Sequence, residues 1–322
     1  MMFRPRLICA AAMVLATIGV ADAQTWPARP IKAVIPFGAG SATDLVPRVV
    51  FEQMSAGLGQ PVIVENRGGA GGSIGANTVA KADPDGYTML ATSSAHTISP
   101  GIYENLPYNA SSDFAGVGLF GSVANVMIIA PSKGFETIQE FVAAAKAKPN
   151  SMNFASVGIG SAVHISAERF RLSAGYEATH IPFKGGAEAL TEIVAGRVDY
   201  YFCPISTAMP FILDGKVIPL VVSSPTRAAS LPNVPTTLEA GFPNSDYTVW
   251  IGLFAPAKTP RPIIDRMHTE MRKALDSPAL QERLKTLGVE PLPLTPVQMD
   301  ERVKSEIEAF RQFAKAAGLK AN

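Results

Sequence analysis

Two glycine-rich loops are the parts of this sequence best suited to chemistry. The first, PFGAGSATD, covers residues 36–44, and the second, NRGGAGGS, covers residues 66–73. Each follows a short apolar run and leads into a segment with helical periodicity, so each ends at the N-terminus of a helix. Backbone N–H groups there bind anions without a basic side chain, because the helix dipole favours negative charge. The two loops therefore predict a site for a small anion.

Neither loop has the spacing of a nucleotide-binding motif. Both depart from the dinucleotide pattern G-x-G-x-x-G and from the phosphate-binding pattern that ends in Gly-Lys-Ser/Thr. An exported enzyme is the competing class of protein. A hydrolase would need a nucleophile elbow G-x-S-x-G or a base matched to a nucleophile, and we expect neither an elbow nor a paired-carboxylate signature here. We therefore expect a binding protein without a cofactor.

The overall composition is that of a globular protein. The chain has 322 residues, of which 47% are hydrophobic and 17% are charged, and its formal net charge is +1. These values exclude a disordered chain and give no reason to expect a nucleic-acid partner. The length predicts two domains, each with its own core.

The N-terminus has the features of a secretory signal peptide. Arg4 and Arg6 precede an apolar stretch over residues 7–20, and Ala21-Asp22-Ala23 is a small-x-small cleavage site. We expect residues 1–23 to be removed and the mature protein to begin near Gln24 in the periplasm. Cys203 is then the one cysteine left, so no internal disulfide can form.

The rest of the chain alternates apolar runs with helical segments, as βαβ units require. Residues 31–36, 61–65 and 87–91 are predicted strands, with helices over 43–54 and 73–81. A second series of strands is predicted at residues 125–130, 152–155, 179–181, 199–203 and 219–223.

The C-terminal segment is predicted to return to the first domain and to cover its sheet with helices. Residues 24–124 and 248–322 would form a discontinuous first lobe, and residues 125–247 the second lobe. Two crossings near residues 123–126 and 246–249 would join them. The fold class is thus α/β, with each lobe a doubly wound sheet and the ligand cleft between the lobes.

Several motifs together resemble those of the Bug family, the substrate-binding proteins of tripartite tricarboxylate transporters. Besides the two glycine loops, they are DPDGYT, FAS followed by GIGS and a histidine, PFKGGA and LPNVPT, at residues 83–88, 154–164, 182–187 and 231–236. The resemblance covers essentially the whole mature chain. It implies a two-lobed periplasmic binding protein that holds a small carboxylate through loop backbone and bridging water.

The resemblance also implies which residues bind the ligand. In the first lobe they are Phe37, Gly38, Ala39, Ser41, Asp44, Ala70, Gly71 and Ser73. In the second lobe they are Ser156, Gly160, Ser161, His164, Lys184, Gly185, Gly186 and Ala187. This sequence departs from many relatives at Ser41, where they have glycine, and at Pro47, where they have alanine.

Some of these side chains have an alternative structural role. Asp44 either contacts the ligand or caps its helix. Arg67 is expected to pair with Glu65, and His164 to form a hydrogen bond in the cleft. His164 and Glu168 have the i, i+4 spacing of metal ligands, but no further ligand set accompanies them, so we expect no metal site. Cys203 is expected to be a buried small hydrophobic residue.

The expected function is the capture of a dicarboxylate, an aromatic acid or an amino acid, and its delivery to membrane subunits of a transporter. We expect the protein to act as a monomer. A periplasmic sensor that reports its ligand to a membrane receptor would use the same fold and cleft, and the sequence does not separate the two.

Overall fold

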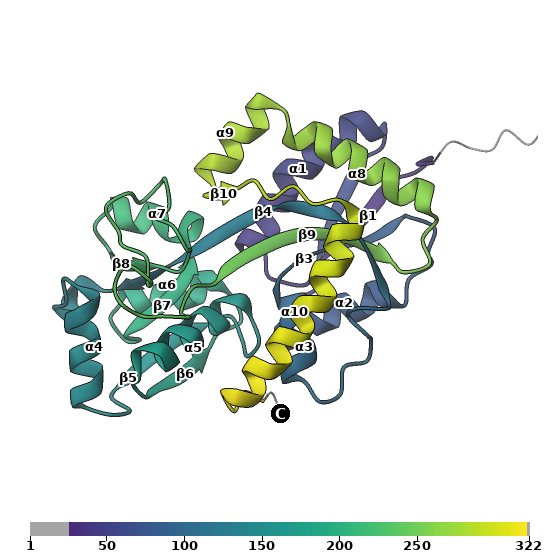
Figure 1. Ribbon diagram of the computed structural model, residues 1–322. Coiled ribbons are helices and arrows are strands. Elements are labelled where there is room, and N and C mark those ends of the chain that lie inside the picture. The colour runs from purple at the N-terminus through teal and green to yellow at the C-terminus, as the bar shows by residue number, and fades with distance from the viewer. Residues whose placement is uncertain (1–25, 321–322) are drawn as a thin grey trace, which may run out of the picture.

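The computed structural model describes residues 26–320 and shows a mixed α/β protein with two lobes (Figure 1). The predicted signal peptide, residues 1–23, lies outside the described residues. Within the described part of the chain, no helix is long and apolar enough to cross a membrane.

The first lobe is built on three parallel strands, with β1 (Ile31–Ile35) between β2 (Val62–Asn66) and β3 (Thr88–Ser93). The sequence predicted each of them to within two residues. Helix α1 (Ala42–Leu58) follows β1, and α2 (Ser73–Ala80) follows β2 after the short 3-10 turn η1 (Ala70–Gly72). Both glycine loops therefore lie at the carboxyl ends of neighbouring strands, as predicted. Helix α3 (Ala95–Ile102) follows β3 and was not predicted.

The second lobe repeats this plan. Its strands are β5 (Met152–Ser156), β6 (Ala178–Pro182), β7 (Tyr200–Pro204) and β8 (Ile218–Val222), each within one residue of the predicted bounds. Its helices are α4 (Ile138–Ala147), α5 (Ala162–Ala174), α6 (Gly186–Val194) and α7 (Ile205–Leu213), after the 3-10 turn η2 (Pro131–Lys133). Thr137 and Glu140 form the predicted capping box at the start of α4.

Two long antiparallel strands, β4 (Phe114–Ile129) and β9 (Thr248–Pro256), connect the lobes (Figure 1). They join the described strands into one sheet of order β2-β1-β3-β9-β4-β7-β5-β6, in which β8 and β10 (Val289–Glu290) also pair with β4. The strand predicted at residues 125–130 was therefore too short. The proposed lobe boundaries fall inside β4 and at the start of β9, where neither strand is interrupted, and they remain a proposal.

Glycines explain why the first half of β4 is hard to recognise in the sequence. Gly116, Gly118 and Gly121 break the apolar pattern of a strand. They are needed for packing, because a Cβ atom on Gly118 would lie 2.2 Å from the terminal methyl group of Met271. The helices of the C-terminal segment can therefore lie directly on β4.

Three C-terminal helices pack on the sheet of the first lobe, of which the sequence predicted the last two. They are α8 (Arg261–Leu275), α9 (Pro278–Thr286) and α10 (Pro296–Ala316). One apolar core lies between the sheet and α1, α8 and α9, and another lies on the opposite face under α2 and α10. The second lobe has a core on each face of its sheet as well. Each lobe thus holds its own loops rigidly at the edge of a well-packed sheet.

Candidate functional site

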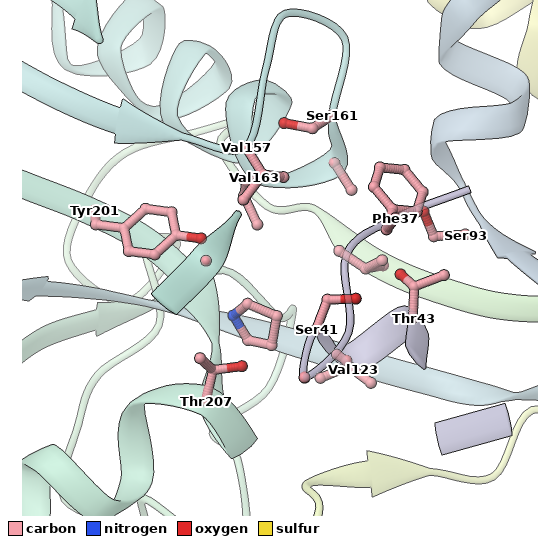
Figure 2. A pocket seen from close by; sticks show the side chains of 16 residues that line it. Phe37, Ser41, Thr43, Ser93, Val123, Val157, Ser161, Val163, Tyr201 and Thr207 are labelled. Carbon is pink, nitrogen blue, oxygen red and sulfur yellow. The ribbon is translucent and has the colours of Figure 1, made fainter. Parts of the chain in front are cut away.

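A small cavity of about 60 Å³ lies between the two lobes (Figure 2). In Figure 2, Phe37, Ser41, Thr43 and Ser93 of the first lobe face Tyr201 and Thr207 of the second across this space. Its complete lining is Phe37, Gly40, Ser41, Ala42, Thr43, Ser93, Val123, Val157, Ser161, Ala162, Val163, Gly186, Tyr201, Pro204, Thr207 and Val249. None of these lining residues carries a charged side chain.

Four helices begin at this cavity. The first residues of α1, α5 and α6 line it, and so does Thr207 in the first turn of α7. In the described structure, α1, α6 and α7 have no side-chain cap, whereas Ser161 caps α5 by accepting from the N–H of His164. Because every helix N-terminus carries partial positive charge, the cavity is suited to an anion although its lining is uncharged.

Free backbone donors are present at two of these helix starts. In α1 the N–H groups of Asp44 and Leu45 both donate to the carbonyl of Ser41. Among the described residues, no acceptor is found for the N–H groups of Ala42 and Thr43. The same is true of Gly186 and Ala187 at the start of α6. These groups can donate to a ligand from opposite lobes.

The first glycine loop is held in place by Asp44. One oxygen of its buried carboxylate accepts from the N–H of Gly40 at 2.9 Å, and the other accepts from Arg48 at 2.9 Å and from Asn66 at 2.8 Å. Asn66 also donates to the carbonyl of Phe37 at 2.9 Å. Asp44 thus fastens its own loop to the end of β2, a role that differs from an ordinary N-cap.

The charge of Asp44 is stabilised by these partners. Burial alone would raise the pKa of its carboxyl, but the hydrogen bonds from Arg48, Asn66 and Gly40 outweigh burial, and the pKa lies below its ordinary value. The carboxylate is therefore ionised at neutral pH, and its two oxygens accept hydrogen bonds from Gly40, Arg48 and Asn66.

The second glycine loop borders a larger hollow of about 630 Å³ beside the cavity, and Phe37 and Val157 line both spaces. Gly71 has φ of 62°, and a Cβ atom there would lie 2.8 Å from the Tyr103 hydroxyl and 2.9 Å from the carbonyl of Ile159. Gly71 therefore allows the two lobes to approach each other at this point. Arg67 pairs with Glu65, as expected.

In the second lobe, a loop after β5 is shaped by serine hydroxyls. Ser156 accepts from the N–H of Gly158 at 3.0 Å, and Ser161 donates to the carbonyl of Gly158 at 2.7 Å. The N–H of Gly160 donates to Nδ1 of His164 at 3.3 Å. His164 is buried beneath this loop, so its hydrogen bond supports the loop from below.

The imidazole rings of His164 and His180 lie against each other with centroids 4.3 Å apart. Burial lowers the pKa of His164 to about 3, with further contributions from His180 and Arg171, and burial lowers the pKa of His180 to about 4. Both rings are therefore neutral at physiological pH, and His180 pairs with the Ser156 hydroxyl at 2.6 Å.

The sequence-predicted binding residues occupy three kinds of position. Phe37, Ser41, Ser161 and Gly186 line the cavity. Phe37, Gly38, Ala70, Gly71 and Lys184 line the adjoining hollow. The remaining predicted residues line neither space and belong to the supporting loops and helix starts; they are Ala39, Asp44, Ser73, Ser156, Gly160, His164, Gly185 and Ala187. Whether each of them contacts a ligand remains a prediction.

Ser41, where the sequence departs from many relatives, has a buried hydroxyl oxygen with no hydrogen-bond partner among the described residues. Since Ser41 lines the cavity, this oxygen is available to a ligand or a bridging water.

Sequence reasoning missed several residues of the site. Thr43, Ser93, Tyr201 and Thr207 line the cavity, and Arg48 and Asn66 hold the first loop. Asn66 and Thr43 lie within or beside the glycine motifs, and could have been found there. Tyr201 and Thr207 carry no local signal, because only the fold brings β7 and α7 to the cavity.

Cys203 is fully buried in the apolar core of the second lobe, as expected. The Glu168 carboxylate accepts from the Arg171 guanidinium at 2.8 Å. Among residues 26–320, no group of three or more His, Cys, Asp or Glu side chains is placed to hold a metal ion.

Comparisons with known proteins agree with this geometry. Residues 46–319 match the family model described as the tripartite tricarboxylate transporter family receptor. The periplasmic binding protein BugD is 33% identical, with a TM-score of 0.86, and the match covers 92% of this chain and 100% of BugD.

Two further solved structures contain ligands. Rpa4515 of R. palustris, solved with adipate, is 30% identical, with a TM-score of 0.88 over 92% of this chain and 100% of that chain. MatC of Rhodopseudomonas palustris, with bound malate, is 33% identical, with a TM-score of 0.84 over 89% of this chain and 99% of that chain. The family model and these full-length similarities show that the chain belongs to the tripartite tricarboxylate transporter receptor family, as a Bug-type solute-binding protein.

Proposed function

We propose that this protein captures a small carboxylate in the cleft between its lobes and delivers it to membrane subunits of a tripartite transporter. The observation that carries the proposal is the meeting of uncapped helix N-termini, from opposite lobes, at a cavity without charged side chains. A carboxylate on the N–H groups of Ala42 and Thr43 would receive two hydrogen bonds and the field of α1.

The ligands of the relatives support a carboxylate. Malate and adipate are both small carboxylates, and the structures that contain them cover nearly the whole of this chain. We extend this ligand class to the present protein, without choosing among dicarboxylates, aromatic acids and amino acids.

Delivery would depend on the positions of the lobes. A ligand that touches both α1 and α6 stabilises the closed arrangement, because the contacts to the second lobe are made only when the lobes meet. A membrane partner that recognises the closed form would then receive loaded protein. The predicted export signal places this exchange in the periplasm.

A melting screen followed by calorimetry tests the proposal. Purified protein beginning at Gln24 is mixed with malate, adipate, benzoate and aspartate, and the ligand is recovered and analysed afterwards. We expect at least one carboxylate to raise the melting temperature and to be recovered unchanged. Turnover of a ligand, or no shift with any carboxylate at millimolar concentration, would contradict the proposal.

The expectation that the sequence contains no nucleophile elbow is wrong, and this feature favours the competing class, a hydrolase. Residues 71–75, GGSIG, have the G-x-S-x-G spacing of a nucleophile elbow. The surroundings of Ser73 do not support this role. It is a buried residue at the start of α2, and in the described structure no histidine is hydrogen-bonded to its hydroxyl. A Ser73→Ala variant that still binds carboxylates would separate binding from any catalysis by this serine.

A further inference from the structure

We propose that Tyr201 sets the ligand specificity of the cleft by donating a hydrogen bond to an acceptor oxygen at the end of the ligand opposite to its α1-bound carboxylate. This inference rests on the proposed function and narrows it. The ligand would be a carboxylate that carries a second oxygen function, and analogues that end in a methyl group would be rejected.

Tyr201 is a buried residue whose hydroxyl faces the cavity. It lies on β7, is only 1% exposed, and lines the cavity together with Gly186 and Thr207. Figure 2 shows its ring reaching from the second lobe with the hydroxyl directed into the cavity, on the side opposite Ser41 and Phe37. Among the described residues, this hydroxyl has no hydrogen-bond partner.

An unpaired buried hydroxyl is costly, and buried tyrosines usually satisfy theirs. The neighbouring Tyr200 points to the other face of the sheet, where it packs in a separate core with Phe141 and Phe154. Tyr201 belongs to the core on the cavity side. A ligand in the cavity would therefore be within reach of its hydroxyl.

The donors that surround this position favour an acceptor oxygen as the partner of Tyr201. Burial raises the pKa of Tyr201 well above its ordinary value, so the hydroxyl keeps its proton. The start of α6 is adjacent, since a Cβ atom on Gly186 would lie 3.5 Å from the Tyr201 hydroxyl oxygen. The N–H groups of Gly186 and Ala187 are donors as well. A methyl group here would leave these donors unpaired, whereas a hydroxyl or carboxylate oxygen would accept from them.

A series of four-carbon carboxylates tests this inference. Butyrate, 4-hydroxybutyrate and succinate share one carboxylate and differ at the other end, which is a methyl group, a hydroxyl or a carboxylate. Calorimetry would compare them on the wild-type protein, on Tyr201→Phe and on Tyr200→Phe. The last variant is the matched control, because it removes a buried hydroxyl from the adjacent residue on the opposite face of β7.

We expect the wild-type protein to bind at least one oxygen-bearing ligand about tenfold or more tighter than butyrate. Tyr201→Phe should weaken that ligand by about tenfold, the loss expected for one hydrogen bond, and leave butyrate unchanged. Tyr200→Phe should preserve the preference. An equal loss for butyrate, or a preference that survives in Tyr201→Phe, would overturn the inference.

A second pair of variants covers the case in which Tyr201→Phe is poorly folded. Gly186→Ala places a methyl group at ordinary van der Waals distance from the Tyr201 hydroxyl, and Tyr200→Phe again serves as the control. We expect Gly186→Ala alone to reduce the preference for oxygen-bearing ligands, and an unchanged preference would overturn the inference. If malate, adipate, benzoate, aspartate and all three test ligands fail to bind the wild-type protein, the proposed function fails and this inference fails with it. Binding of these ligands with no dependence on Tyr201 or Gly186 overturns the inference alone.

Discussion

The hydrogen bond between Tyr103 and Ile159 offers a direct measurement of lobe closure. Tyr103 follows α3 in the first lobe, and its hydroxyl donates to the carbonyl of Ile159, in the second-lobe loop after β5, at 3.1 Å. A Tyr103→Phe substitution removes this interlobe bond and keeps the ring. The apolar contacts among Ile98, Ile102 and Ile165 beside it remain.

The expected size of the effect follows from a single neutral hydrogen bond. Such a bond contributes about 0.5–1.5 kcal/mol, so its loss should shift the balance from closed to open by about two- to twelvefold. If the ligand binds only to the closed form, its apparent dissociation constant should rise by up to the same factor, and by the whole of it when the closed form is the minority without ligand. The ligand-saturated protein should keep its closed shape, because the ligand contacts are intact.

Calorimetry and small-angle scattering, each with and without saturating ligand, measure the two quantities. Tyr87→Phe is the control, since its hydroxyl accepts from the N–H of Ala28 at 2.9 Å within the first lobe. We expect Tyr87→Phe to leave affinity and radius of gyration unchanged. Unaltered affinity in Tyr103→Phe, or an equal loss in both variants, would refute the view that interlobe contacts are coupled to binding.

Three further predictions concern the glycine loops and the two buried histidines beneath the second-lobe loop. Gly71→Ala should lower the free energy of unfolding by about 1–2 kcal/mol, because Gly71 has a positive φ and the new methyl group would push Tyr103 and Ile159 apart. Gly38→Ala is the control, since a methyl group there meets open space and should leave the melting temperature unchanged. Equal melting temperatures in the two variants would contradict this prediction. Asp44→Asn should lower the free energy of unfolding in urea by about 2 kcal/mol, because it replaces a carboxylate that accepts three hydrogen bonds. Arg67→Gln is the control, and it should change the free energy of unfolding by less than about 0.5 kcal/mol. His164 and His180 should show neutral imidazole signals by NMR at pH 5.5. Because their pKa values are lower in the folded than in the unfolded protein, the free energy of unfolding should fall as the pH drops from about 6.5 toward 4. Charged rings at pH 5.5 would show that the two side chains are not buried.

The sequence was sufficient to predict the parts of the site that depend on local backbone chemistry. Glycines followed by a helical segment identify an anion-binding loop wherever they follow a buried strand, and both loops of the first lobe were found in this way. The strand pattern of the second lobe was equally clear, since its runs are short and bounded by turns.

Residues whose role depends on distant parts of the chain could not be predicted. Tyr200 and Tyr201 are adjacent in a strand that is buried on both faces, so periodicity does not show which of them reaches a cavity. Tyr103 becomes significant only because the fold brings it to a loop 56 residues later in the chain. The early part of β4 was missed because its glycines serve the helices packed on it.

The continuous strands between the lobes have a mechanical consequence. At the crossing, Val123 pairs with Val249 on one side and with Val289 of β10 on the other. Three hydrogen-bonded strands resist shearing and bending within the plane of the sheet more than bending out of that plane, so any hinge motion of the lobes would follow mainly the second direction. A flexible linker would permit a broad set of orientations, each to be discriminated by a receptor. In the proposed mechanism, occupancy would instead change mainly one angle, and a docking partner would have to sense only that angle.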